Sequence, residues 1–427
     1  MKLQLQPTNL STDPFAVFRN LVGKYDNCFL LETLGTSPGP SYIGVDPKRV
    51  YSSEDSSFYD LKSSFTTNPQ TQPGYVGGLV GYTSHEAIQQ WEPSLGFRYP
   101  RQFHDFQFGE YQDGLIFRPG KAPDYFHYGR SQLKKYQLQK SKTKRLQIRF
   151  DSAQKDQAMY EAMINKAKAD IQAGRVFQVV LANRYEYGFD GDLVTLYEQL
   201  REVNPSEYMF FIKFGKTIVL GASPELLIHV TPGRKVSLEA LAGTIKRGTD
   251  ALSDERLGNQ LKTDEKELAE HSMLVDLARN DVGRVSKIGS VKIDDLMYIK
   301  KLSHVQHLCS LIIGELADGE DMFSALAAAA PAGTLTGTPK IEATKMIAEL
   351  EGTERGPYGG TIGYFSYGGD SVHAVNIRSI SAHNNRLTMH SGSGIVYDSQ
   401  AANEYEEVAR KKAAMDEAMK PFLESQL

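Results

Sequence analysis

The sequence is poor in cysteine, in long apolar segments and in net charge. Only Cys28 and Cys309 occur in 427 residues, so neither a disulfide framework nor a thiolate metal site is expected. No apolar run reaches the ~18 residues that a membrane helix needs, and residues 1–6 lack the apolar core of a signal peptide. The formal net charge of −4 argues against nucleic acid as the main partner. We therefore expect a cytoplasmic protein that binds neither nucleic acid nor membranes.

The chain is long enough for two or three structural units, and its composition changes near residues 120–150. The Lys/Gln-rich stretch 131–145 indicates a linker or an exposed hairpin. After it, apolar residues recur every fourth position and predict a helix over 156–174 with Gly174 at its C-cap. Residues 176–187 are rich in β-branched and aromatic side chains and predict a strand. We divide the chain into an N-terminal regulatory-type region, 1–145, and a catalytic region, 150–420.

Two glycine-rich segments resemble each other. Residues 77–82 read Gly-Gly-Leu-Val-Gly-Tyr, and residues 359–364 read Gly-Gly-Thr-Ile-Gly-Tyr. This echo indicates duplicated α+β units. Because strands and helices do not alternate as strict βαβ repeats, the pattern favours an α+β protein over a doubly wound parallel sheet.

Two acidic clusters each place a pair of glutamates three residues apart. If both clusters are helical, Glu267 and Glu270 share one face, and so do Glu404 and Glu407. Four converging carboxylates need a cation, and hard oxygen ligands without paired His or Cys favour Mg²⁺. The alternative is two solvated helix faces, with Glu407 and Lys411 forming an ordinary i,i+4 pair.

Several short motifs surround these clusters, and together they carry a family resemblance. They are Ser223-Pro224-Glu225, Leu241-Ala242-Gly243-Thr244, Ser303-His304-Val305-Gln306-His307, residues 331–340 (Pro-Ala-Gly-Thr-Leu-Thr-Gly-Thr-Pro-Lys), Tyr358-Gly359-Gly360, Ile377-Arg378 and Ser391-Gly392-Ser393-Gly394. In this order and spacing they resemble the chorismate-binding region shared by anthranilate synthase component I, aminodeoxychorismate synthase, isochorismate synthase and salicylate synthase. The resemblance is strong over about residues 150–420 and weaker in the N-terminal third. It implies a two-layer antiparallel β-sandwich surrounded by helices.

The resemblance assigns a Mg²⁺ site and a substrate site. The metal ligands are Glu270 and Glu407, with Glu267 and Glu404 as neighbours that hold coordinated water. Arg378 matches the arginine that binds the enolpyruvyl carboxylate of chorismate, a task that suits a planar guanidinium. The other residues assigned to substrate binding are Gly243, Thr244, Thr334, Tyr358, Gly392, Ser393, Gly394 and Lys411.

Three catalytic residues follow from the same resemblance. Glu225 matches the acid that protonates the departing C4 hydroxyl, which requires its pKa to be raised by burial or a like charge. Isochorismate and salicylate synthases resemble one another in having a lysine base where this chain has Gln178, and a neutral amide cannot activate water. His307 is the candidate for the elimination half of the reaction and is preferred over His304 because its spacing to Thr334 fits the family pattern.

One residue separates the two families that use ammonia. Many aminodeoxychorismate synthases resemble one another in having lysine before the Gly-Thr pair, whereas Ala242 is the form of anthranilate synthases. The resemblance therefore implies a Mg²⁺-dependent lyase that converts chorismate and ammonia to anthranilate and pyruvate in tryptophan biosynthesis. Aminodeoxychorismate synthase of folate biosynthesis is the first alternative, and an isochorismate or salicylate synthase is the next. No glutaminase arrangement of Cys, His and Glu is apparent, so glutamine use would require a separate amidotransferase subunit.

The N-terminal third contains a candidate tryptophan site that resembles the feedback site of anthranilate synthases. The residues assigned to it are Leu31, Glu32, Thr33, Ser41, Asn204, Pro205, Tyr208 and Met209. Two positions depart from the family, since Thr33 stands where serine is usual and Glu207 where proline is usual. We expect the added methyl and carboxylate groups to affect inhibition. Tryptophan is thus a candidate inhibitor.

Overall fold

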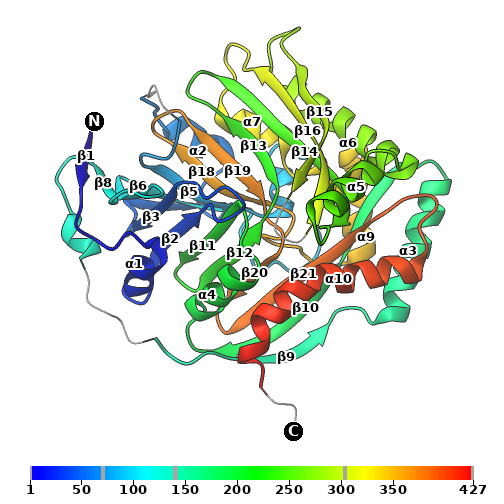
Figure 1. Ribbon diagram of the computed structural model, residues 1–427, viewed down its shortest axis with the longest axis horizontal. Coiled ribbons are helices and arrows are strands. Elements are labelled where there is room, and N and C mark those ends of the chain that lie inside the picture. The colour runs from blue at the N-terminus through cyan, green and yellow to red at the C-terminus, as the bar shows by residue number, and fades with distance from the viewer. Residues whose placement is uncertain (1, 69–72, 138–142, 302–304, 425–427) are drawn as a thin grey trace.

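Two antiparallel sheets form the centre of the protein (Figure 1). The computed structural model describes residues 2–68, 73–137, 143–301 and 305–424. The larger sheet has twelve strands, in the order β1 (Leu3–Pro7), β8 (Asp124–Tyr128), β7 (Asp113–Phe117), β3 (Ser41–Val45), β2 (Asn27–Glu32), β11 (Tyr208–Phe214), β12 (Thr217–Ser223), β20 (Ser379–His383), β21 (Arg386–Ile395), β10 (Gln178–Asp190) and β17 (Gly337–Thr338), with β9 (Gln147–Ala153) also paired to β10. The smaller sheet has nine, in the order β15 (Lys292–Lys301), β16 (Val305–Glu315), β14 (Lys235–Lys246), β13 (Leu226–Val230), β19 (Ser371–Val375), β18 (Thr361–Ser366), β5 (Gly78–Thr83), β6 (Phe106–Tyr111) and β4 (Arg49–Ser52).

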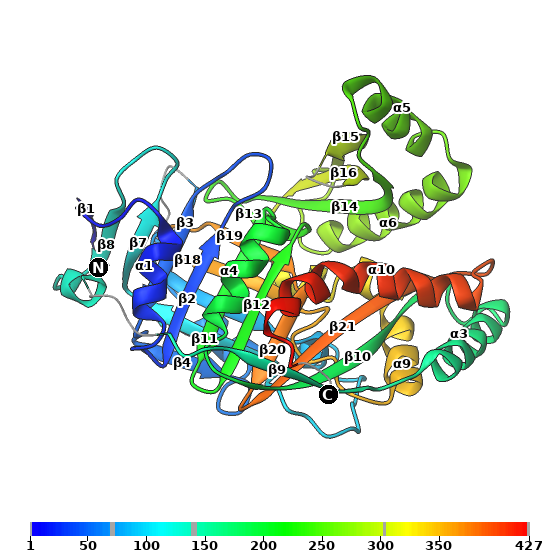
Figure 2. The ribbon, with the colours of Figure 1, turned by 60° about the horizontal axis from the view of Figure 1, so that its bottom comes forward.

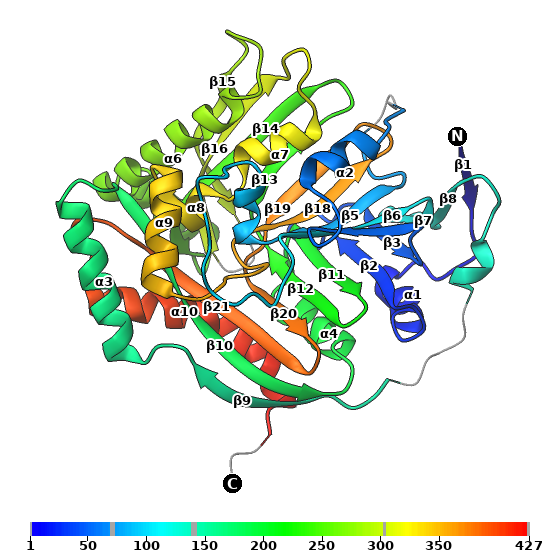
Figure 3. The same ribbon diagram turned by 180° about the vertical axis from the view of Figure 1, so that it is seen from behind.

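Helices cover the outside of the sheets, as the view from behind also shows (Figure 3). They are α1 (Pro14–Leu21), α2 (Phe58–Ser64), α3 (Gln157–Gln172), α4 (Val194–Val203), α5 (Ala251–Leu261), α6 (Glu265–Gly283), α7 (Met322–Ala329), α8 (Gly333–Thr336), α9 (Lys340–Glu351) and α10 (Ala401–Met419), together with the short 3₁₀ turns His85–Gln90, Leu133–Tyr136 and Lys420–Phe422. Helices α5 and α6 project from the body together with the ends of β14, β15 and β16 (Figure 2). The predicted α+β class and the helix-covered two-layer sandwich are confirmed.

None of the helices in the described ranges is long and apolar enough to cross a membrane. The cytoplasmic location and the absence of a nucleic-acid partner stay predictions.

Strands from both predicted regions of the chain share each sheet. In the larger sheet β2 pairs with β11, and in the smaller sheet β5 pairs with β18. The boundary predicted near residue 145 therefore does not separate the sheets, and the regulatory role of 1–145 stays a prediction. The two segments that echo each other in sequence become neighbours, with Gly81 opposite Gly363. A Cβ at either glycine would lie within about 2 Å of a backbone oxygen, so side chains are excluded there; the distances are 1.9 Å at Gly81 and 2.0 Å at Gly363.

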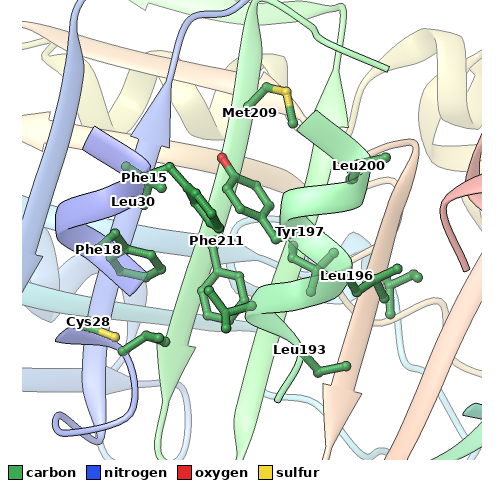
Figure 4. Close-up of a cluster of buried hydrophobic side chains, with 14 of the residues drawn as sticks. Phe15, Phe18, Cys28, Leu30, Leu193, Leu196, Tyr197, Leu200, Met209 and Phe211 are labelled. Carbon is green, nitrogen blue, oxygen red and sulfur yellow. The ribbon is translucent and has the colours of Figure 1, made fainter. Parts of the chain in front are cut away.

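The sheets bury apolar side chains on both faces. Along β11, Met209 and Phe211 join a cluster with α1 and α4 (Figure 4), whereas Phe210 and Ile212 join a second cluster. This second cluster contains Val80 of β5 and side chains of β18, so it fills the space between the sheets. The alternation of side chains along a strand thus builds one layer under the helices and one between the sheets.

The helix and strand predicted after residue 150 both exist, with shifted ends. Helix α3 begins after its N-cap Asp156 and ends at Gln172, and Gly174 follows with φ +80°. The predicted strand begins two residues late and extends to Asp190 as β10. Of the four apolar residues that recur every fourth position, Met159, Met163, Ala167 and Ile171, the first is 54% exposed and the other three are buried. A spacing of four drifts by about 40° per step on a helix of 3.6 residues per turn, so the first of four such positions leaves the buried face.

The Lys/Gln-rich stretch 131–145 is anchored in part to the larger sheet. It contains a 3₁₀ turn over Leu133–Tyr136, and Tyr136 is buried. The Tyr136 hydroxyl donates to a carboxylate oxygen of Asp113 at 2.8 Å. Residues 138–142 lie outside the described ranges.

The chain crosses between the two sheets at two adjacent points, and these crossings position the site. Strand β12 of the larger sheet leads through Pro224 and Glu225 into β13 of the smaller sheet. Strand β19 of the smaller sheet leads back through Arg378 into β20 of the larger one. Backbone hydrogen bonds join the crossings, since Val375 donates to the Glu225 carbonyl and Ala222 donates to the Arg378 carbonyl. A carboxylate and a guanidinium are therefore brought to the same edge of the sandwich.

Candidate active site

Glu225 is a buried carboxyl group held by one hydrogen bond. It is 6% exposed, and its Oε1 accepts from the Thr334 hydroxyl at 2.6 Å. Burial raises the pKa of Glu225 to about 7, and the charge of Glu239 acts in the same direction. The Thr334 hydrogen bond, Arg378 and Lys300 oppose the rise. Glu225 thus has the buried setting that its expected role requires, with a pKa suited to giving a proton near neutral pH.

His307 presents one free ring nitrogen. Its Nδ1 lies 3.1 Å from the Gly243 carbonyl and 3.0 Å from the Thr244 hydroxyl. Because a carbonyl only accepts, Nδ1 carries the proton and Nε2 has the lone pair. Nε2 is buried and has no hydrogen-bond partner among the described residues. Burial lowers the pKa of His307 to about 4, so the neutral ring is a base ready to accept a proton. The alternative His304 lies outside the described ranges.

Arg378 is a poorly solvated cation without a hydrogen-bonded anion. Its backbone has φ +49°, in the left-handed region that non-glycine residues seldom adopt. No described residue forms a hydrogen bond or an ion pair with its guanidinium, although the Glu225 carboxyl acts on it electrostatically. Burial lowers the pKa of Arg378 because desolvation disfavours the charged form. A guanidinium in this state is a binding site for a carboxylate.

The two acidic pairs approach each other across α6 and α10. Burial raises the pKa of both Glu267 and Glu270, and the Glu407 charge raises each further. Glu404 also raises the pKa of Glu270, and its own Oε2 is buried with no partner among the described residues. The carboxylates of the two helices are therefore close enough to act on one another, although the i,i+4 pair of Glu407 with Lys411 that the alternative expected is also present.

This carboxylate cluster is loosely arranged. Within the residues that the structure describes, no three His, Cys, Asp or Glu side chains are placed to hold a metal ion by themselves. Lysines neutralise part of the charge, since Lys411 lies 2.7 Å from Glu407 and Lys266 lies 3.8 Å from Glu270. Such a cluster suits an ion that takes one or two protein carboxylates and completes its shell with water and substrate oxygens, as Mg²⁺ does.

Glycine backbone connects the carboxylate cluster to the catalytic residues. Gly243 has φ +63°, and a Cβ there would lie 2.7 Å from Oε2 of Glu267. On the other side, the Lys411 ammonium donates to the Gly392 carbonyl at 3.2 Å. Gly243, Gly392, Lys411 and the acidic pairs are therefore brought together, as the sequence predicted.

Gln178 lies at the start of β10, beside the glycines of β21. It is 8% exposed, and its Oε1 has no partner within the described ranges. A Cβ at Gly394 would lie 2.8 Å from Nε2 of Gln178, so glycine leaves room for the amide. Ser393 lies between Gly392 and Gly394 in β21. Because successive side chains of a strand point to opposite faces, the Ser393 side chain lies on the face away from the two glycines, and only its backbone lies beside them.

Tyr358 is buried and packs against one ring and one cation. Its ring stacks on His390 with centroids 5.0 Å apart, and the Arg355 guanidinium lies 5.9 Å from its centroid. Along the chain, Thr334 belongs to α8, which precedes α9, and Tyr358 lies in the loop that follows α9. Both helices pack near β10, so these residues are placed around the start of that strand.

A smaller cavity of about 30 Å³ lies beside Glu225 and Glu239, and a larger cavity of about 210 Å³ opens between the two sheets. Five residues of the candidate tryptophan site line it: Leu31, Glu32, Thr33, Tyr208 and Met209. Ser41, Asn204 and Pro205 do not, although Pro40 and Tyr42 beside Ser41 do. The Glu32 carboxylate is already bound by Arg201 and the Tyr197 hydroxyl.

The sequence interpretation missed two charged residues next to the site. Glu239 of β14 and Lys300 of β15 are joined at 2.7 Å, and both act on the pKa of Glu225. Glu239 is 8% exposed within a mostly apolar stretch of β14, Val236 to Leu241, in which it is the one charged residue. A lone acid in such a strand was the signal available, because buried charges require a partner.

Glu225, His307 and Arg378 thus lie around one edge of a sandwich, and the sequence and the fold of the chain are similar to those of known proteins. The chorismate binding enzyme family matches residues 26–417. Anthranilate synthase component 1 of Methanothermobacter thermautotrophicus is 36% identical over 431 residues, which cover 95% of this chain and 92% of that protein. The protein of the same name from Saccharolobus solfataricus is 34% identical, with coverage of 98% and 99%.

Solved structures agree. The crystal structure of anthranilate synthase component I from Streptococcus pneumoniae superposes with a TM-score of 0.74 at 28% identity, covering 97% of this chain and 92% of that one. The menaquinone-specific isochorismate synthase of Escherichia coli has the same fold, with a TM-score of 0.78 at 20% identity and coverage of 98% and 94%. Because the family matches residues 26–417 and named relatives match the chain over nearly its whole length, the chain belongs to the chorismate binding enzyme family.

Proposed function

We propose that the protein is the catalytic component of an anthranilate synthase, which converts chorismate and ammonia to anthranilate, pyruvate and water. The observation that carries this proposal is the buried Glu225, whose pKa of about 7 suits an acid for C–O cleavage. Support for the choice of reaction comes from relatives named anthranilate synthase component 1, which match the chain almost from end to end.

Binding of chorismate would use the two charged regions of the site. The Arg378 guanidinium, which has no hydrogen-bonded anion, would hold the enolpyruvyl carboxylate. Glu270 and Glu407 would hold Mg²⁺, with Glu267 and Glu404 beside them. Mg²⁺ held there would neutralise this carboxylate cluster and supply positive charge for the ring carboxylate of the substrate.

Glu225 would act in the first step. As the nitrogen of ammonia bonds to C2, the ring double bond shifts and the C4–O bond breaks, and the Glu225 carboxyl donates its proton to the departing hydroxyl, which leaves as water. The ammonium group formed at C2 then loses one proton to solvent. Glu225 must be protonated at the start, and its raised pKa keeps a substantial fraction in that form near neutral pH. The Thr334 hydroxyl then stabilises the carboxylate that remains.

Ammonia rather than water is favoured as the nucleophile. Water needs a base for activation. Gln178 stands where isochorismate and salicylate synthases have a lysine base, and it is a buried neutral amide. Unprotonated ammonia is already nucleophilic. Ala242, which precedes the Gly-Thr pair, has no amino group to intercept C2.

His307 would act in the second step. Its Nε2 takes the proton from C2, the enolpyruvyl C–O bond breaks, and the ring becomes aromatic. The departing enolate of pyruvate takes up a proton. A neutral imidazole is required, and the pKa of about 4 leaves His307 unprotonated at neutral pH.

Two binding functions complete the proposal. A separate glutamine amidotransferase subunit would supply ammonia, because neither Cys28 nor Cys309 is accessible; both are buried, and burial raises the pKa of each thiol. Tryptophan would bind in the larger cavity, which is lined by aromatic side chains such as Tyr42 and Phe210 and by Thr33. Its presence between the sheets supports a regulatory site apart from Glu225.

The two halves of the reaction can be tested separately. Glu225→Gln should abolish C–O cleavage while chorismate still binds in the presence of Mg²⁺, as measured by calorimetry. His307→Gln should accumulate an amino intermediate and release no pyruvate. Glu255→Gln, on the exposed face of α5, is the control for losing one carboxylate. Loss of chorismate binding in Glu225→Gln, or full pyruvate release by His307→Gln, would show that the roles are assigned wrongly.

A further inference from the structure

Two cavities of the protein adjoin. The larger one, between the sheets, contains Glu207 in its wall, and a smaller one of about 30 Å³ is lined by Glu225 and Glu239. Leu226, the chain neighbour of Glu225, lines both. A group that contacts the larger cavity is therefore only a few side chains away from the proposed catalytic acid.

A single lysine connects the two cavities. The Lys300 ammonium lies 2.7 Å from a carboxylate oxygen of Glu207 and 2.7 Å from one of Glu239. Its side chain is 15% exposed, so water screens these contacts weakly. Glu239 also accepts from the Tyr298 hydroxyl. Two carboxylates thus share one cation, and the group as a whole carries a net negative charge.

Charged groups face Glu225 from several elements. Glu239 comes from β14 and Lys300 from β15, while Arg378 comes from the crossing between β19 and β20. Asp281 of α6 also lines the smaller cavity, but the Lys340 ammonium is 2.8 Å from its carboxylate and compensates it. Of these groups, only Glu239 and Lys300 connect onward to the larger cavity.

The larger cavity favours a ligand that carries an ammonium group. No lysine or arginine lines it in the described ranges. Glu32 is bound by Arg201, whereas Glu207 is 25% exposed and shares with Glu239 the one cation that pairs with it in the described part of the chain. A ligand amine that pairs with Glu207 would leave Lys300 to Glu239 alone.

We propose that Glu207, Lys300 and Glu239 form an ion-pair chain through which an ammonium-bearing ligand in the larger cavity changes the charge beside Glu225. Lys300 is then a positioning residue, and Glu207 is the point at which the ligand acts. When the ligand ammonium pairs with Glu207, Lys300 pairs with Glu239 alone and compensates its charge more fully. The surroundings of Glu225 therefore become less negative. A less negative environment favours the carboxylate form, so fewer molecules hold the proton that C–O cleavage needs, and the ligand inhibits. This inference rests on the proposed role of Glu225 as the acid.

The test is the pH dependence of anthranilate formation at a constant concentration of unprotonated ammonia. Activity that requires protonated Glu225 is present below its pKa and falls as the pH rises through it. Glu239→Gln removes a negative charge and should move this alkaline fall to lower pH by roughly one pH unit, and Lys300→Met should move it to higher pH by a similar amount. Lys300→Arg keeps the charge and should restore the wild-type profile. Shifts in opposite directions are not expected from a purely structural role.

The action of the ligand on Glu225 is tested separately. L-tryptophan should move the alkaline fall of the wild type to lower pH, whereas indole-3-propionate, which lacks the amine, should not. Glu207→Gln should lose this response to tryptophan. Thermal melting confirms that each variant is folded, and if Lys300→Met does not fold, Glu239→Gln and Glu207→Gln decide the question.

Two failures are distinguishable. A wild type that makes no anthranilate would refute the proposed function. A wild type that makes anthranilate, with an alkaline fall that stays in place in Glu239→Gln and under tryptophan, would refute the ion-pair chain alone.

Discussion

The raised pKa of Glu225 has a consequence for stability that can be measured without substrate. Its pKa is about 7 in the folded protein against an ordinary value of 4.5. Between these values the folded state binds a proton that the unfolded state has released. The free energy of unfolding therefore falls as the pH rises through this window, and each pH unit costs about 1.4 kcal/mol. In total, the ionised Glu225 destabilises the fold by about 3 kcal/mol above the window.

Glu225→Gln removes this dependence. The Gln oxygen still accepts from Thr334, and any cost of the new amide group is the same at every pH. The difference in unfolding free energy, variant minus wild type, should therefore increase by about 2.5 kcal/mol between about pH 5 and about pH 8. Equilibrium urea unfolding at several pH values measures this difference. Glu255→Gln, on an exposed face of α5, corrects for the general effect of losing one negative charge.

A difference that stays constant over this range, after that correction, would refute the reasoning. It would mean that the pKa of Glu225 is not raised and that burial does not prepare this carboxyl as an acid.

Three further predictions concern activity. Thr334→Val removes the hydrogen bond that lowers the pKa of Glu225, so the alkaline fall of the rate should move to higher pH by roughly one to two pH units. The Thr336 hydroxyl donates to the Ala332 carbonyl instead, so Thr336→Val should leave the fall in place. Arg378→Lys keeps the charge but loses the planar fork, and the KM for chorismate should rise about tenfold or more in steady-state assays. Glu270→Gln should raise the Mg²⁺ concentration for half-maximal activity by about tenfold or more, whereas Glu406→Gln, at an exposed position on α10, should not. An unchanged alkaline fall in Thr334→Val, an unchanged KM in Arg378→Lys or an unchanged Mg²⁺ requirement in Glu270→Gln would each contradict the role assigned to that residue.

Local patterns in the sequence predicted the elements that local chemistry determines. The N-cap Asp156, the apolar face of α3 and the β-branched run of β10 are all readable from neighbouring residues. The sequence showed that the two glycine-rich segments are similar but did not predict that they pair, because pairing and register depend on strands far apart in the chain. The absence of a division between the sheets near residue 145 was not predictable for the same reason.

The site was predicted in part. The raised pKa of Glu225 and the proximity of Glu267 and Glu407 were both expected from the family resemblance. Lys300 and Glu239 were missed because neither belongs to a motif, and their pairing depends on how β15 and β14 flank β16. Long-range ion pairs of this kind have no local sequence signature.

Product analysis of the purified chain tests the central claim most directly. Chorismate, ammonium at alkaline pH and Mg²⁺ are supplied, anthranilate is followed by fluorescence and pyruvate is measured in parallel, with an EDTA control. The account predicts anthranilate and pyruvate in equal amounts, and neither when EDTA is present. An amino product without pyruvate would identify an aminodeoxychorismate synthase, and isochorismate or salicylate would contradict the interpretation of Gln178.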